Sequence, residues 1–286
     1  MGRVLDAMTS AGVIPEREFE FTDKDFKFVQ WFMHKHVGIY LSDKKMPMVY
    51  GRIARRLREH KLQRFSDYRP LIEEEGEERV NFINGLTTNK THFFREMHHF
   101  DHVEKVLIPK WIAEKRTKVR IWSAGCSTGE EPYSYMSLLA STPLFDRVPD
   151  VKLLATDLDT NVLATAEKGV YSEEQISAIP KPCLKAGFVR GRGEHEGMIK
   201  AKSDLQSHMT FRQLNLFSPW PFKGPFDLIS CRNVMIYFDK PTQQDLIQRF
   251  HQYLASDGHL FIGHSEGIGE CADRFENLGH TMFQKR

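Results

Sequence analysis

Hydrophobic residues in the first third of the chain recur with the spacing of amphipathic helices. Phe26, Val29 and Met33 lie three or four residues apart, just after a Thr22/Asp25 pair of the kind that caps a helix start. Further helices are predicted from about 42 to 60, from 65 to 74 and from 77 to 84. The segment from about 20 to 116 therefore reads as helical almost throughout.

The pattern changes after Lys118, where short apolar runs of strand length alternate with segments of helix length. The runs cover residues 119–125, 151–157, 208–215, 226–233 and 259–265, and a final one at 281–285 can add an antiparallel strand. Strands that alternate with helices indicate a doubly wound, mostly parallel α/β sheet.

One interval breaks this alternation. Between residues 169 and 207 two short β-prone runs flank a glycine-rich turn, which predicts a hairpin or small antiparallel sheet inserted into the α/β unit. We therefore expect an all-helical domain at 15–85 and an α/β domain at 86–286 that carries a β-subdomain at about 169–207.

Composition and charge narrow the classes of protein that this chain can represent. The 286 residues are 41% hydrophobic, and 40 Lys and Arg against 38 Asp and Glu give a net charge of only +2, which argues against a surface built for nucleic acid. The longest uncharged stretch, 132–145, is shorter than the roughly 20 residues that span a bilayer. Residues 1–12 lack the apolar core of a signal peptide, and four scattered cysteines suit a reducing cytoplasm.

Candidate chemistry gathers where the predicted strands end. The first strand opens into a turn with glycines at 125 and 129, and the second strand ends at Asp157, an acid placed to bind a ribose diol. Glu130 and Glu131 follow the turn directly, and their negative charge would repel a pyrophosphate. A positively charged ligand with a ribose, such as S-adenosylmethionine, fits this pattern better than a dinucleotide.

Two further groups lie at the same predicted edge of the sheet. Asn215 and Leu216 end the third strand, where an amide and a backbone N–H can meet an adenine. Arg232, Asn233 and Tyr237 follow the fourth strand. Arg232 could instead cap a helix or pair with an acid, but the three residues together favour a functional site.

Four motifs along the chain are similar to those of one known family. The segments TTNKTHFFRE (87–96), IWSAGCSTGEEPYS (121–134), ATDLDT (155–160) and CRNVMIYFDK (231–240) resemble the bacterial chemotaxis receptor glutamate methyltransferases. The resemblance runs from about Asp25 to Phe283. It implies an all-helical N-terminal domain, a linker and a Rossmann-like methyltransferase domain with a small β-subdomain. It also implies methyl transfer from S-adenosylmethionine to glutamate side chains of chemoreceptor cytoplasmic domains, with S-adenosylhomocysteine as the other product.

The family's roles carry over to matching positions of this sequence. The implied cofactor pocket comprises Asn89, Thr91, Arg95, Glu131, Asp157, Asn215, Leu216, Arg232 and Asn233. Arg95 and Tyr237 are the implied catalytic residues, beside the methyl group. A glutamate side chain has a pKa of about 4.3 and is already ionised near neutral pH, so the reaction needs no general base. The lack of an obvious His–Asp or Cys–His arrangement agrees with this mechanism.

Two surfaces are candidates for receptor recognition. Residues 44–64 hold eight Lys or Arg and one acid, and Arg52, Arg55, Arg56 and Arg58 fall opposite the apolar side of the predicted helix. This can be a merely solvated face, but arginines suit carboxylate recognition, and the resemblance implies contact with the acidic methylation region of a receptor. The resemblance also implies that the β-subdomain binds a C-terminal receptor peptide on an exposed strand edge, through Arg190 and Lys200.

Alternatives from other classes stay open at this point. A nucleic-acid methyltransferase could use the basic helix, although Asn233 precedes Val-Met-Ile rather than the Pro-Pro-aromatic sequence of amine methyltransferases. A non-catalytic protein that senses the cofactor while it docks on receptors is a second alternative. His92, His98, His99 and His102 lie close together, but no HExxH motif or nearby cysteine accompanies them, so we expect no metal. We further expect a monomer that neither binds nucleic acid nor inserts into membranes.

Overall fold

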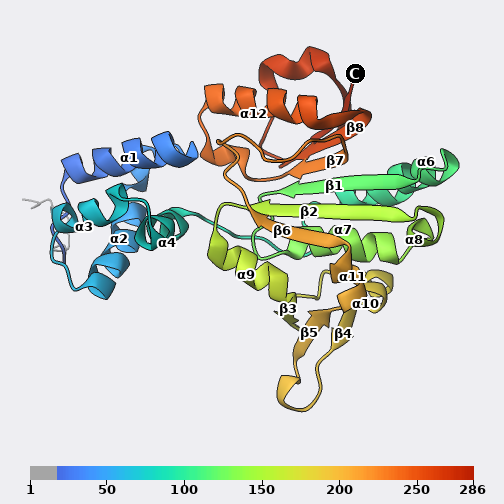
Figure 1. Ribbon diagram of the computed structural model, residues 1–286, viewed down its shortest axis with the longest axis horizontal. Helices are drawn as coiled ribbons and strands as arrows, with labels where there is room; N and C mark the ends of the chain where they lie inside the picture. Colours follow the sequence, from blue (N-terminus) through green and yellow to red (C-terminus); the bar gives the residue numbers. More distant parts are fainter. Residues whose placement is uncertain (1–17) are drawn as a thin grey trace, which may run out of the picture.

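The structure is a computed structural model that describes residues 18–286. Residues 1–12 and the first residues of the expected helical domain, 15–17, lie outside the described residues. A bundle of helices lies at one end of the molecule, the main sheet with its flanking helices fills the centre, and a small second sheet projects from one side (Figure 1).

From residue 18 on, four helices and one short 3-10 turn form the N-terminal bundle. They are α1 (Asp23–Val37), η1 (Asp43–Lys45), α2 (Met46–His60), α3 (Phe65–Glu73) and α4 (Glu77–Leu86). The predicted cap of α1 is present: the Thr22 hydroxyl accepts the N–H of Asp25 at 3.3 Å, and the Asp25 carboxylate accepts the N–H of Thr22 at 2.7 Å. The helix predictions for this region are therefore confirmed.

The apolar stripe of α2 lies in the core of the bundle. Val49, Ile53 and Leu57 are all buried and belong to one cluster with Phe26 and Phe65 of the neighbouring helices. Full burial of one such aliphatic side chain stabilises the fold by about 1.5–3 kcal/mol. The opposite side of α2 is thereby turned away from the core.

Residues 87–97, which were expected to be helical, form an irregular linker instead. Phe94 and Glu96 have φ angles of 53° and 57°, a conformation that interrupts a right-handed helix. Phe93 and Phe94 are buried in the core of the α/β domain, and this packing fixes the linker. Helical turns resume as α5 (His98–His102), a π-helical segment η2 (Val103–Leu107) and α6 (Ile108–Ala113).

Among the described residues, the main sheet has seven strands. They are β1 (Lys118–Ala124), β2 (Asp150–Asp157), β6 (Met209–Gln213), β7 (Phe226–Cys231), β8 (Leu254–Ile262), β9 (Phe275–Gly279) and β10 (Met282–Lys285), in the spatial order β6-β2-β1-β7-β8-β10-β9. The first five strands in this order are parallel, and β10 is antiparallel to both of its neighbours. The expected parallel sheet and terminal antiparallel strand are confirmed.

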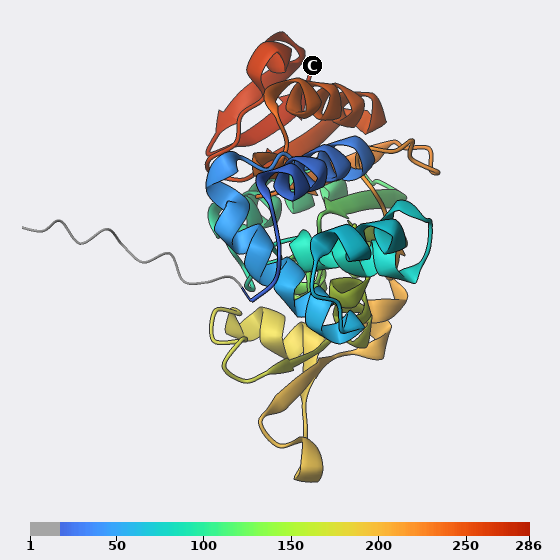
Figure 2. The same cartoon turned by 90° about the vertical axis from the view of Figure 1, so that its left-hand side faces the viewer.

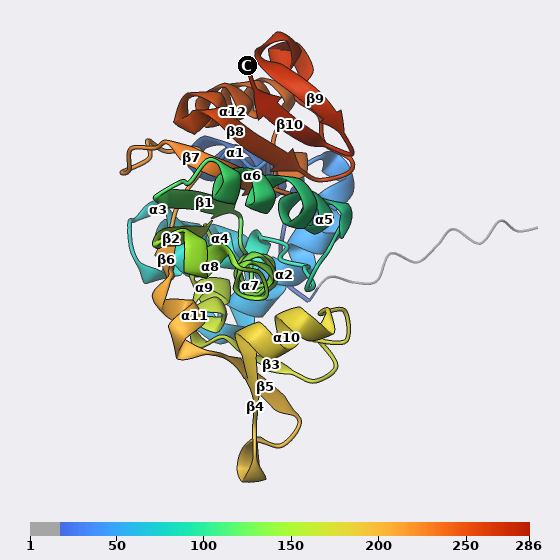
Figure 3. The same ribbon diagram turned by 90° about the vertical axis from the view of Figure 1, so that its right-hand side faces the viewer.

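Helices cover both faces of this sheet. The remaining helices are α7 (Glu130–Ala140), α8 (Leu144–Arg147), α9 (Thr160–Lys168), α10 (Lys181–Gly187), α11 (Ser203–Ser207) and α12 (Lys240–Tyr253), with 3-10 turns η3 (Gly193–His195), η4 (Met235–Tyr237) and η5 (Gly269–Arg274). Successive residues of β1 point to different cores: Ile121 packs with α6, α7 and α9, whereas Trp122 packs with α12. The sheet lies between these layers (Figure 3), so the doubly wound arrangement is confirmed.

The predicted insertion is a separate three-stranded antiparallel sheet. Its strands are β3 (Val170–Ser172), β4 (Phe188–Arg190) and β5 (Met198–Ala201), in the order β3-β5-β4. The β4–β5 hairpin points away from the rest of the molecule (Figure 1). This leaves β4 at the edge of the small sheet.

The helical bundle faces the carboxyl ends of the central strands. The arrows of β1 and β2 point toward α1–α4 (Figure 1), and the bundle lies in front of the sheet when it is viewed from that side (Figure 2). A short bridge joins the two parts, because the N–H of Tyr40 donates to the carbonyl oxygen of Tyr237 at 2.8 Å. Within residues 18–286, none of the helices combines the length and apolar character needed to cross a bilayer.

Candidate active site

A cavity of about 360 Å³ lies between the helical bundle and the carboxyl edge of the sheet. The strand order reverses between β1 and β7, which is where open α/β sheets bind their ligands. Every residue predicted for the cofactor pocket, and Tyr237, lines this one cavity: Asn89, Thr91, Arg95, Glu131, Asp157, Asn215, Leu216, Arg232 and Asn233. The structure therefore brings together predicted residues that are up to 148 positions apart, from Asn89 to Tyr237.

The turn from β1 into α7 forms one wall of the cavity. Gly125 and Gly129 have φ angles of 95° and 97°, which L side chains rarely adopt. A Cβ on Gly125 would overlap the Val234 side chain, and one on Gly129 would lie 2.9 Å from the Cβ of Ala166. Both glycines are thus required by the local packing, independently of any ligand.

Asp157 fixes this turn from the end of β2. Its carboxylate accepts the N–H of Ser127 at 2.8 Å and the N–H of Asp159 at 3.0 Å. Burial raises the pKa of Asp157, which is 9% exposed. The side chain both holds the turn in place and contributes an acceptor to the wall of the cavity.

Asp159 fastens the linker to the sheet and was not identified from the sequence. Its Oδ2 accepts hydrogen bonds from the Thr87 hydroxyl at 2.9 Å and the Asn89 amide at 2.7 Å, while Oδ1 caps α9. The Ser127 hydroxyl also donates to the carbonyl oxygen of Asn89 at 2.8 Å. The position of Asp159 just before a helix was the one signal in the sequence that could have found it.

Arg232 lies between two carboxylates. Its side chain is 2% exposed, and its guanidinium is 2.9 Å from Oε2 of Glu131 and 3.2 Å from Oε2 of Glu96. The alternative considered from the sequence, that Arg232 pairs with an acid, is therefore correct. Arg232 and Glu131 nevertheless both face the cavity.

Glu96 is a second residue that sequence reasoning missed. It accepts hydrogen bonds from the backbone N–H of His264 at 3.2 Å and from its Nδ1 at 2.9 Å. Burial alone would raise the pKa of Glu96, but the bonds from His264 and the charge of Arg232 lower it to about 2. The carboxylate is therefore ionised and holds Arg232 from behind the cavity.

Arg95 and Tyr237 present polar groups to the cavity. Arg95 lies between two residues with positive φ, and its guanidinium donates to the carbonyl oxygen of Lys90 at 3.0 Å. None of the carboxylates within residues 18–286 lies within 4.0 Å of it. The Tyr237 hydroxyl donates to the carbonyl oxygen of Thr88 at 3.2 Å, and burial raises its pKa, so it stays protonated near neutral pH.

The two asparagines predicted to bind the cofactor, Asn215 and Asn233, form hydrogen bonds within the protein. The Asn215 amide donates to the carbonyl oxygen of His36 at 2.7 Å, at the end of α1. Asn233 has a φ angle of 60°, and its backbone N–H donates to Glu266 at 3.0 Å. Glu266, which the sequence did not single out, also accepts N–H groups from Gly263 and Ile236 and so shapes this loop.

The helical bundle supplies a wall that the sequence did not predict. Its lining residues are Val37, Ile39, Leu41, Lys45, Met48 and Leu86. The Lys45 ammonium lies 5.5 Å from the centre of the Tyr237 ring. The cavity is therefore mainly apolar on the bundle side and polar on the sheet side, which is typical of sites for small cofactors.

The four arginines of α2 have different surroundings. Arg55 is exposed, whereas Arg52 donates to the carbonyl oxygen of Thr87 at 2.5 Å and to the Thr88 hydroxyl at 3.0 Å. Arg56 forms a mostly buried ion pair with Glu78 and a more exposed one with Glu59, and Arg58 pairs with Glu18. Arg190 and Lys200 are exposed on the β-subdomain, away from the cavity.

The donors and acceptors of the cavity fit S-adenosylmethionine. Carboxylates at Glu131 and Asp157 suit a ribose diol and an ammonium, the amides and backbone suit an adenine, and Arg95 suits a carboxylate. The volume lies in the range of cofactor pockets, about 300–1,000 Å³. The residues present therefore match each polar part of this cofactor.

Comparison with known proteins agrees with this fit. Residues 24–87 match a family model described as "CheR methyltransferase, all-alpha domain", and residues 89–284 match "CheR methyltransferase, SAM binding domain". Chemotaxis protein methyltransferase 2 of Pseudomonas aeruginosa is 40% identical over 281 residues, which cover 98% of this chain and 99% of that protein. The chemotaxis protein methyltransferase of Escherichia coli is 41% identical over 265 residues, 92% of this chain and 91% of that one. The chain therefore belongs to the CheR family of methyltransferases that act in chemotaxis, and S-adenosylmethionine is its cofactor.

Proposed function

We propose that this chain transfers the methyl group of S-adenosylmethionine to glutamate side chains of chemoreceptors and forms glutamate methyl esters. The observation that carries the proposal is that a cationic side chain, Arg95, and a protonated hydroxyl, Tyr237, line the same cofactor cavity. These two groups can position a carboxylate, and methyl transfer to a carboxylate needs no general base. The family match gives no support to a nucleic-acid methyltransferase or to a non-catalytic sensor.

The nine residues predicted for the cofactor pocket are proposed to hold the cofactor, with Arg95 and Tyr237 nearest the reacting groups. When bound, S-adenosylmethionine supplies a methyl group on a positively charged sulfur. Arg95 is free to orient a carboxylate, because no carboxylate among residues 18–286 neutralises it. The Thr88 carbonyl oxygen fixes the direction of the Tyr237 hydroxyl. Orientation of this kind can contribute several kcal/mol to lowering a barrier.

The apolar wall from the helical bundle supports the same reaction. Ile39, Leu41 and Met48 cover the cavity on the side opposite the sheet. Such a wall excludes water from the space where an anionic carboxylate and a cationic centre neutralise each other. The bundle would thus serve both recognition and catalysis.

The exposed side of α2 is the proposed docking surface for the receptor. Arg55 projects into solvent, and Arg52, whose partners are uncharged, extends the positive charge along the same helix, whereas Arg58 can add its charge only by leaving Glu18. Residues 44–64 carry eight Lys or Arg and one acid, a charge that complements the acidic methylation region of a helical receptor. Arg52 also contacts the linker at Thr87 and Thr88, so this surface runs up to the cavity.

The β-subdomain is proposed to bind the C-terminal tail peptide of a receptor. Within the described part of the chain, strand β4 pairs on one side only, with β5, which leaves an edge for a further strand. A groove of about 280 Å³ beside it has apolar walls and several cations: Lys181, Leu184, Lys185, Phe188, Val189, Arg190 and Ile199. An apolar peptide that ends in a carboxylate fits this combination. Lys200 lies on β5 next to this groove, at the register of Val189.

Two further expectations from the sequence stay predictions. One is that the chain is a monomer, and the other is that it acts in the cytoplasm. All four cysteines are unpaired and buried, as in proteins of reducing compartments.

A methyl-transfer assay tests the proposal. Purified chain is incubated with radiolabelled S-adenosylmethionine and a receptor cytoplasmic fragment, and the label released as methanol by mild base is counted, since esters are base-labile and methylated amines are not. We expect base-labile label that Tyr237→Phe diminishes and that a receptor fragment with Glu→Ala at the modified positions does not acquire. Base-stable label, or none, would reject glutamate as the acceptor.

A further inference from the structure

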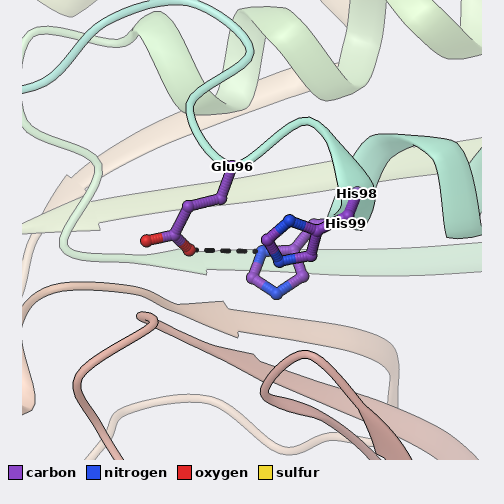
Figure 4. A group of neighbouring side chains, drawn as sticks. All are labelled: Glu96, His98 and His99. Carbon is purple, nitrogen blue, oxygen red and sulfur yellow. Dashed lines mark ion pairs between the residues drawn. The ribbon is translucent and has the colours of Figure 1, made fainter.

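A cluster of metal-ligating side chains lies just behind the cavity, at the start of α5. Glu96, His98 and His99 each place one ligand atom so that the three atoms lie within 4.8 Å of one another. Figure 4 shows the Glu96 carboxylate directed at the His99 ring, with the His98 ring beside it. None of the three lines the cofactor cavity.

The hydrogen bonds of His99 determine which of its nitrogens carries the proton. Nε2 lies 3.0 Å from the carbonyl oxygen of His280, and since a carbonyl cannot donate, Nε2 is the protonated nitrogen. With the proton on Nε2, Nδ1 of the ring presents a lone pair. Nδ1 is buried, without a hydrogen-bond partner among the described residues, and 3.6 Å from Oε2 of Glu96. Two acceptors therefore face each other with no proton between them.

His98 adds a second buried ring nitrogen to the cluster. Its Nε2 is buried and has no hydrogen-bond partner within residues 18–286. The ring centre lies 4.3 Å from that of His99 and 5.3 Å from that of His280. Unsatisfied buried nitrogens cost free energy, and a bound cation would remove that cost.

The chemistry of these groups selects the class of ion. Two imidazole nitrogens and one carboxylate suit a borderline divalent metal such as Zn²⁺ or Co²⁺, with a fourth position left for water. The bond from His99 Nε2 to the His280 carbonyl is the kind of outer contact that orients histidine ligands. On the other side, Glu96 is held by the N–H and Nδ1 of His264.

We propose that Glu96, His98 and His99 form a binding site for a divalent transition metal and that metal bound there weakens binding of the methyl donor. The link is Oε2 of Glu96, which faces His99 and also accepts from Arg232 at 3.2 Å. A metal on this oxygen competes with Arg232 for its negative charge. Arg232 lines the cofactor cavity and pairs with Glu131, so the loss of this anchor disturbs that wall.

Charge also sets the strength of the site. Arg232 is a fixed cation beside Oε2 and opposes the metal. The antagonism is reciprocal, because two ligands that weaken each other do so by the same factor. The expected site is therefore one of micromolar rather than nanomolar affinity, suited to a signal and not to a permanent structural metal.

Metal binding is tested on the full chain by titration of Zn²⁺ against a chromophoric chelator, and of Co²⁺ by its visible absorption. We expect one equivalent to bind with Kd of about 1–10 µM and His98→Ala to weaken it about 10–100-fold. His195→Ala, on the exposed β4–β5 loop, is the matched control and should bind as the unaltered chain does. His98→Gln repeats the test with a side chain of similar size, and circular dichroism confirms that each variant is folded.

Coupling is tested by calorimetric titration of S-adenosylhomocysteine with and without saturating Zn²⁺. We expect Zn²⁺ to raise its Kd at least about threefold in the unaltered chain and in His195→Ala, with no change in His98→Ala. Absence of binding below about 100 µM Zn²⁺, or binding that neither His98 variant weakens, would overturn the site. Equal cofactor affinity with and without Zn²⁺ would overturn the coupling. Neither readout uses a methyl acceptor, so both are independent of the proposed substrate.

Discussion

Two adjacent arginines of α2 offer a sharp test of the proposed receptor surface. The Arg55 side chain is 81% exposed, and among residues 18–286 its one ion-pair partner is Glu59, at 3.3 Å. The Arg56 side chain is 18% exposed and forms an ion pair with Glu78, itself 15% exposed, which also accepts a bond from the Tyr68 hydroxyl. We predict that Arg55→Glu weakens receptor recognition while the fold persists, and that Arg56→Ala mainly destabilises the helical bundle.

The structure sets the size of each effect. Exposed ion pairs contribute about 0–1 kcal/mol to stability, and removing one partner of a buried pair costs about 3–5 kcal/mol. The Arg56–Glu78 pair is mostly but not fully buried, so we expect Arg56→Ala to lower the unfolding free energy by an intermediate amount, about 2 kcal/mol. Arg55→Glu loses one exposed contact and places like charges at positions 55 and 59, which costs only about 0.5 kcal/mol of stability. It also changes the charge of the docking surface by two. A penalty of about 1 kcal/mol in recognition corresponds to a fivefold rise in KM for the receptor.

The assays are urea unfolding and methyl transfer to a receptor fragment at low and high salt. We expect Arg55→Glu to raise KM by about fivefold at low salt and by less at about 0.5 M salt, because exposed charges are screened. Arg56→Ala should lower the unfolding midpoint while its folded fraction keeps a nearly normal KM. The reasoning is refuted if Arg56→Ala leaves the midpoint unchanged, or if Arg55→Glu leaves KM unchanged at low salt.

Three further predictions concern the cavity and the core. Tyr237→Phe and Arg95→Ala should each lower kcat by about 10–100-fold, because each removes one group that positions the reacting atoms; normal turnover in both would reject their assignment. Burial lowers the pKa of His259 to about 4 from its usual 6.5, so the stability it contributes is present above pH 6.5 and is lost as pH falls toward 4. Between about pH 8 and pH 5 this amounts to about 2 kcal/mol, and His259→Leu should show a correspondingly smaller fall in urea-unfolding free energy over that range. Gly125→Ala should lower the melting temperature and cofactor affinity together, since its Cβ would overlap Val234 and its φ is 95°; an unaltered melt would contradict the overlap.

The sequence predicted most of the elements because local pattern and tertiary environment agree in them. Strand-length apolar runs became the buried strands of the main sheet, and the Thr22/Asp25 pair became the cap of α1. The predicted cofactor residues share one cavity because the carboxyl ends of parallel strands meet at one edge. Strand β9 was not predicted, because its sequence, FENLG, lacks an alternating apolar pattern. Within residues 18–286 the strand joins the sheet through its pairing with β10.

Other features could not be predicted because they depend on contacts between distant residues. The 87–97 segment is irregular because Phe93 and Phe94 pack into the core of the α/β domain. The sequence could not distinguish Arg56 from the other three arginines of α2, because its ion-pair partner Glu78 lies on a different helix. Glu96 gains its role only from Arg232 and His264, which lie more than 130 positions away along the chain.

The central claim is that the cavity between the helical bundle and the sheet is where the methyl donor binds. A crystal structure of the chain grown with saturating S-adenosylhomocysteine tests it most directly. The account predicts the ligand inside this cavity, with its polar groups on Asp157, Arg95 and the loop after β6. Electron density for the ligand at any other place, or an empty cavity at saturating concentration, would contradict it.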